Sequence, residues 1–145
     1  MPNWVRAGIA YFVVVFVIGF LLGIIRVTLV VPRVGVLVAV AFELPLMLWA
    51  SWIVCRNLVE RFGVAGTTPL RLGMGAVAFG ILMIAEAALA VFLMGQTVAQ
   101  HFASYGSAHA ILGLAGQVAF ALIPWVQRDT TKQSGVAIKR TTPQS

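Results

Sequence analysis

The stretch AGIAYFVVVFVIGFLLGIIRVTLVV, residues 7–31, contains one charged side chain, Arg26. A helix rises 1.5 Å per residue and the hydrocarbon core of a bilayer is about 30 Å thick, so about 20 apolar residues span it. Three further stretches of this kind follow, at residues 34–54, 72–95 and 106–126. The sequence therefore predicts an all-α integral membrane four-helix bundle, running up-down-up-down with short loops, in one domain over residues 1–128.

The composition supports the membrane class. Of 145 residues, 61% are hydrophobic and 10% are charged, and the mean hydropathy is +0.99. A soluble domain of this size would be about half apolar and about a quarter charged. The single cysteine, Cys55, excludes an intramolecular disulfide.

The basic residues predict the orientation of the chain, which carries a net charge of +6. They flank the spans on one side: Arg6, Arg56, Arg61, Arg71, Arg128, Lys132, Lys139 and Arg140. The first connection has only Arg33 and the third has no basic residue. By the positive-inside rule we expect a multi-pass protein with both termini cytoplasmic. The clusters would contact anionic lipid headgroups, and residues 129–145 would form a disordered basic tail.

Three charged side chains, Arg26, Glu43 and Glu86, fall inside the apolar stretches. A charge in hydrocarbon costs on the order of 3 kcal/mol or more, so each needs a partner, water or a function. Counted from the outer helix ends, they lie about 8, 13 and 13 Å deep, and Gln117 about 16 Å. The sequence therefore predicts one buried polar layer with a contribution from each helix.

Glycine spacing suggests which helix faces carry this layer. Gly19, Gly23 and Arg26 share a face, and the GxxxG pattern is typical of close helix contacts. His109 and Gln117 lie four residues before and after Gly113, so we expect His109 to join the layer and Gly113 to mark a contact face.

The layer contains two carboxylates and one arginine. Glu43 follows a tight turn after Arg26 and is the expected permanent partner of the arginine. Glu86 is flanked by alanines and is the expected functional carboxyl. Whether the layer is a structural clamp or a functional site stays open at this point.

The pattern Gly19-x3-Gly23-x2-Arg26, Val31-Pro32-Arg33-x-Gly35 and Glu43-x-Pro45 resembles small bacterial inner-membrane proteins known as uncharacterised four-span proteins. The resemblance covers the first two spans. It implies a bacterial four-helix membrane protein and attaches no activity.

Three functions fit these observations. The first is a small transporter or channel component, or a ligand-binding bundle, that uses the Arg/Glu layer. The alternative is a non-catalytic accessory subunit of a larger membrane complex. A membrane enzyme or haem carrier, with His101 or His109 as ligand, comes third. We expect no enzymatic activity, no cofactor and no metal, no nucleic-acid partner, and assembly as a homo-oligomer or within a larger complex. A transporter needs water at the carboxylates, whereas an accessory subunit needs a dry, paired cluster.

Overall fold

The computed structural model describes residues 1–128 in full and the backbone of residues 129–141. The chain forms α1 (Asn3–Ile25), the π-helical segment η1 (Arg26–Val30), α2 (Val31–Val34), α3 (Val36–Phe62), α4 (Thr68–Phe92), α5 (Val98–Ala103), the 3₁₀ segment η2 (Ser104–Gly106) and α6 (Ala108–Thr141). The predicted disorder of residues 129–145 falls on residues that lie outside the fully described part, and it stays a prediction.

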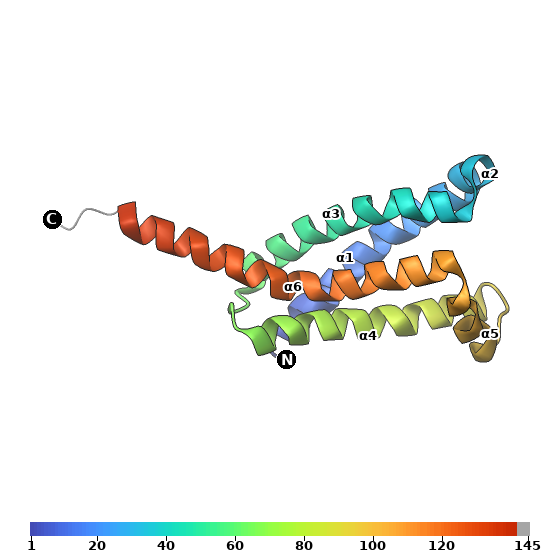
Figure 1. Ribbon diagram of the computed structural model, residues 1–145. Helices are drawn as coiled ribbons and strands as arrows, with labels where there is room; N and C mark the ends of the chain where they lie inside the picture. The colour runs from blue at the N-terminus through green and yellow to red at the C-terminus, as the bar shows by residue number, and fades with distance from the viewer. Residues whose placement is uncertain (142–145) are drawn as a thin grey trace.

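The predicted all-α four-helix bundle is confirmed, with four helical segments long and apolar enough to cross a membrane (Figure 1). The helices extend beyond the predicted apolar spans at the end that carries the α3–α4 loop, whereas α3, α4 and α6 begin or end two or three residues inside them at the other end. The helices extend because hydropathy marks the part of a helix that suits lipid, whereas the backbone hydrogen bonds continue into polar residues.

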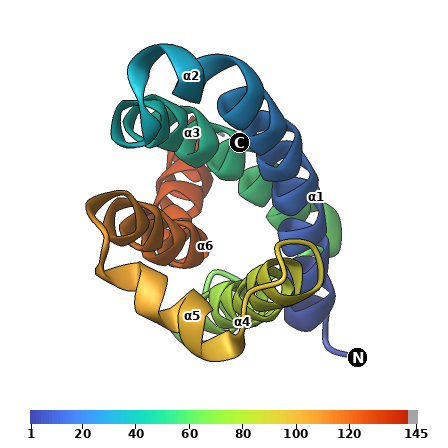
Figure 2. The same cartoon turned by 90° about the vertical axis from the view of Figure 1, so that its right-hand side faces the viewer.

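The long helices form two hairpins, α1 with α3 and α4 with α6 (Figure 1). In the end view of Figure 2, α1 and α6 lie on opposite corners, as do α3 and α4. Packing agrees, because α1 and α6 each contact both α3 and α4. The loop between α3 and α4 therefore joins diagonal helices and ties the two hairpins together.

The hairpins converge at the end that carries the α3–α4 loop and diverge toward α2 and α5 (Figure 1). The buried core lies at the converging end: Ala7, Tyr11, Val15, Cys55, Val59, Val64, Met74, Ala78, Phe120 and Ile123. Two glycines allow the close approach there. A Cβ on Gly8 would lie 2.8 Å from the Met74 carbonyl oxygen, and one on Gly75 would overlap the Ala121 carbonyl.

The connections at the diverging end are short and ordered. Gly35 has φ +84°, a conformation that residues with a Cβ rarely adopt, and it reverses the chain between α2 and α3. The third connection contains the short helix α5. Thr97 and Gln100 form a capping box at its start.

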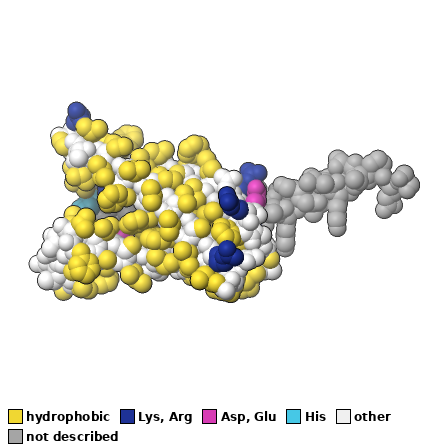
Figure 3. All heavy atoms as spheres, turned by 180° about the vertical axis from the view of Figure 1, so that it is seen from behind, with side chains coloured by type: hydrophobic (Ala, Val, Ile, Leu, Met, Phe, Trp, Pro, Cys, Tyr) yellow, Lys and Arg dark blue, Asp and Glu magenta, His cyan; other side chains and the backbone are white. Residues whose placement is uncertain are grey.

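The outer surface of the bundle is apolar. Large hydrophobic side chains such as Val17, Leu21, Trp49 and Ile84 are more than 45% exposed. Figure 3 shows hydrophobic side chains along the flank, Lys and Arg side chains gathered at one end, and basic side-chain atoms also at the tip of the opposite end. A soluble monomer rarely exposes so large an apolar area. The four apolar helices are those of a multi-pass membrane protein.

Candidate functional site

A cavity of about 710 Å³ lies between α1, α3, α4 and α6, in the half of the bundle where the hairpins diverge. Its polar lining includes Arg26, Glu43, Glu86 and Gln117, one from each of the four helical segments, and the remaining lining is mostly apolar. The space-filling view shows a hollow on this half, with an acidic side chain visible inside (Figure 3). The side chains expected to form a polar layer thus face one open space.

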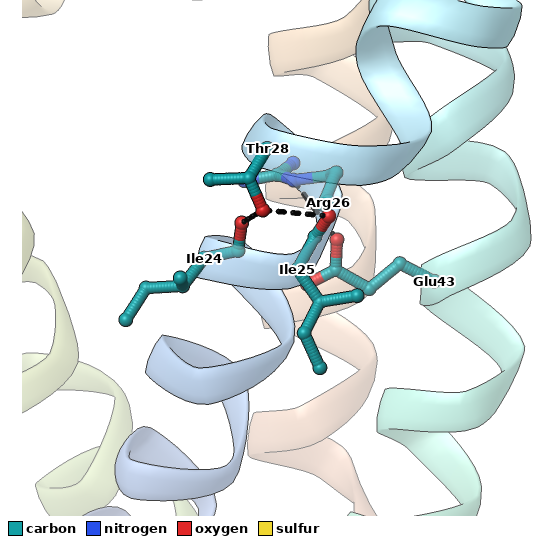
Figure 4. A network of polar contacts seen from close by, with 5 residues as sticks. All are labelled: Ile24, Ile25, Arg26, Thr28 and Glu43. Carbon is teal, nitrogen blue, oxygen red and sulfur yellow. Dashed lines mark hydrogen bonds and ion pairs between the residues drawn. The ribbon is translucent and has the colours of Figure 1, made fainter.

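Arg26 and Glu43 form an ion pair across the first hairpin (Figure 4). The Nε atom of Arg26 lies 3.0 Å from Oε2 of Glu43, and the two side chains are 32% and 17% exposed. The Nε–H is not directed at the oxygen, so the contact is electrostatic and lacks a linear hydrogen bond. The expected partner of Arg26 is therefore the one that the structure provides.

The backbone at Arg26 departs from the α-helix. Pro32 has no N–H and its ring crowds the carbonyl four residues earlier, which disfavours a regular α turn. The helix widens into η1, where Val31 N–H donates to the Arg26 carbonyl. The Thr28 hydroxyl donates to the Ile24 carbonyl at 2.7 Å (Figure 4). Wide turns of this type occur often at functional sites, and this one contains the cavity arginine.

Glu86 and Gln117 join α4 to α6 on the other side of the cavity. The Nε2 atom of Gln117 donates to Oε1 of Glu86 at 2.5 Å. The Oε1 atom of Gln117 is buried and has no hydrogen-bond partner. Among residues 1–128, no Arg or Lys forms an ion pair with Glu86. The carboxyl thus accepts a hydrogen bond from a neutral amide and has no Arg or Lys partner among these residues.

Two residues of the third connection lie beside Glu86, and the sequence reasoning missed them as a pair. The His101 Nε2 atom is 3.5 Å from the Tyr105 hydroxyl, and both residues are close enough for electrostatic interaction with Glu86. Burial raises the pKa of Tyr105, and the neighbouring Glu86 charge raises it further. The hydroxyl therefore stays protonated at neutral pH and can donate toward the carboxyl. His101 and Tyr105 are four residues apart, and this helical spacing could have indicated that their side chains are neighbours.

Two expectations about α6 are wrong. His109 is exposed and contacts the Ser107 hydroxyl at 3.4 Å, outside the cavity. Each step of four residues rotates about 40° around a helix, so His109 and Gln117 are about 80° apart. Gly113 marks no helix contact, because a Cβ there would meet nothing within 4 Å. It lines the cavity instead.

A second buried polar group lies at the converging end, where Arg71 is 1% exposed. Its Nε atom donates to the Ala65 carbonyl at 3.1 Å and so fastens the α3–α4 loop. Cys55 nearby is fully buried in the protein core. From the sequence, Arg71 counts among the basic residues that set the membrane orientation. Such a count carries no information on which side chains are buried.

The described residues contain no group of three or more His, Cys, Asp or Glu side chains that could hold a metal ion. Comparison of the chain with protein-family models, curated proteins and solved structures finds no match. The resemblance to four-span proteins therefore stays a prediction, and the cavity is the feature that indicates a function.

Proposed function

We propose that this protein binds a small molecule in the cavity between its two hairpins, and acts as a small transporter or channel component. The observation that carries the proposal is that polar side chains of four helical segments face a cavity of about 710 Å³. Ligand sites in proteins are commonly about 300–1,000 Å³, mostly apolar, with a few placed polar groups. The cavity has this size and this character.

The accessory-subunit alternative requires a dry cluster whose charges are matched. Arg26 and Glu43 satisfy that requirement by themselves. Glu86 does not, since its observed partner is a neutral amide and it faces the cavity. A water path to Glu86 therefore separates the two functions.

Labelling of introduced cysteines tests for this path. In a Cys55→Ala background, Gly113→Cys places a thiol on the cavity wall, where a Cβ meets nothing within 4 Å. We expect a membrane-impermeant maleimide to label it in the protein in nanodiscs, where both faces of the bilayer are accessible, because the thiol would be hydrated and reachable from the α2–α5 end. Mass spectrometry of the purified protein measures the labelled fraction.

Gly80→Cys is the matched control. Gly80 is also a glycine of a long helix where an added Cβ would meet nothing within 4 Å, but it is outside the cavity lining. Its thiol would face lipid and should stay unlabelled. If both cysteines stay unlabelled while both proteins fold, the cavity is dry and the accessory role is favoured.

We further propose the inner membrane of a bacterium as the location, with both termini in the cytoplasm. The bacterial location rests on the resemblance of the first two spans. The orientation rests on the distribution of Arg side chains: Arg6, Arg56, Arg61 and Arg128 lie at the converging end, and Arg33 at the other. An alkaline phosphatase reporter fused after Ser145 should be inactive, whereas one inserted at Gly95 should be active. The reverse pattern would invert the orientation.

A further inference from the structure

Aromatic side chains form one wall of the cavity. Phe12, Phe16 and Phe20 are spaced by four residues on α1 and all line it. The ring centroids of Phe12 and Phe16 are 5.1 Å apart, and those of Phe16 and Phe20 are 6.5 Å apart. Phe120 on α6 adds a further ring. The faces of such rings are negative and attract cations.

The charged lining is also negative. Arg26 is held by Glu43 in an ion pair, and the second carboxyl of the lining, Glu86, has no such partner among residues 1–128. The groups that face Glu86 from neighbouring elements are Gln117 of α6, His101 of α5 and Tyr105 of η2. One arginine against two glutamates leaves an excess negative charge in the cavity.

Building on the proposed ligand cavity, we propose that its ligand is an organic cation with an apolar body. The cationic centre would lie at the Glu86 carboxylate, and the body would pack on the phenylalanine rings. A cation would pair with Glu86, which forms no ion pair with an Arg or Lys among residues 1–128. Coulomb attraction beside the mostly apolar lining exceeds that in bulk water. An anion would be repelled by Glu86, and a neutral molecule would leave the carboxylate unmatched.

Two of the four glycines of the lining, Gly23 and Gly113, leave room for such a body, whereas Gly19 packs against Met47 and Gly116 against Leu44. A Cβ at Gly113 would meet nothing within 4 Å, and one at Gly23 would meet only the Arg26 guanidinium, at 4.0 Å. Quaternary ammonium ions are a suitable probe class, because they are permanently charged and aromatic side chains recognise them.

Titration of the full-length protein in nanodiscs with dibenzyldimethylammonium tests the proposal, with empty nanodiscs as reference. The uncharged carbon isostere, in which carbon replaces the ammonium nitrogen, has the same shape. We expect calorimetry to give a dissociation constant at least tenfold lower for the cation than for the isostere. Because both titrations use the unmodified protein, this comparison does not depend on how any variant folds.

Variants locate the charge partner. Glu86→Gln should weaken binding of the cation at least tenfold, whereas Glu60→Gln, at an exposed carboxyl outside the cavity, should not change it. Phe16→Leu should weaken binding about threefold to thirtyfold, the range of cation–π contacts. Phe79→Leu on α4, outside the lining, is its control and should bind as the unmodified protein does.

Equal affinity for the cation and its isostere would overturn the proposal and mark the cavity as a site for uncharged molecules, including lipid chains. Unchanged affinity in a folded Glu86→Gln variant would overturn it as well. The two proposals fail separately. If Gly113→Cys is labelled but the cation is not preferred, the ligand class is wrong and the wet cavity stands. If Gly113→Cys is not labelled, the proposed function itself fails.

Discussion

Gly75→Ala is expected to destabilise the bundle more than any other single methyl addition at its glycines. A Cβ at this position would overlap the Ala121 carbonyl of α6, which is backbone and cannot rotate away. The helices α4 and α6 must then move apart at the end that contains the buried core. Overpacking usually costs about 1–3 kcal/mol, and a rigid backbone neighbour favours the upper part of this range. Unfolding of the purified protein in mixed micelles of increasing SDS content measures the change.

Gly80→Ala is the control for that experiment, since it lies on the same helix. A Cβ there meets nothing within 4 Å, so the helix preference of alanine should leave stability unchanged or raise it by up to about 1 kcal/mol. Equal effects of the two substitutions would show that α4 and α6 do not approach each other at Gly75.

Arg26→Met is expected to destabilise the protein by about 3 kcal/mol, because it leaves the Glu43 carboxylate without its cation in a mostly apolar setting. Glu43→Gln should also destabilise the protein, because it leaves the Arg26 guanidinium without its carboxylate. The double variant should recover part of the loss, because neither charge then remains unmatched. Thermal unfolding in detergent measures all three.

The control is Arg33→Met, which removes an exposed arginine that forms no ion pair within residues 1–128. Its effect should stay within about 0.5 kcal/mol, as is usual for surface changes. If the losses for Arg26 and Glu43 simply add in the double variant, the two charges do not interact in the membrane, and the ion pair is not part of the fold.

Several features followed from the sequence alone. The four apolar stretches determined the number and type of the helices, because a bilayer core admits few other backbone arrangements. Residue depth brought Arg26, Glu43, Glu86 and Gln117 to a common level, since the rise of a helix is constant. The short turn at Gly35 put Glu43 beside Arg26, and the two side chains are 3.0 Å apart.

Only the tertiary structure decided what that common level encloses. Whether Gly113 packs or lines a cavity depends on the splay of the hairpins, which approach each other closely at Gly8 in the converging end and separate toward α2 and α5. Helical rotation removed His109 from the layer, and the fold of the third connection brought His101 and Tyr105 to Glu86. Sequence spacing gives the depth of each residue in the membrane and the helix face on which it lies. The tilt between helices depends on many contacts between residues that are distant in the chain. That tilt opens the cavity.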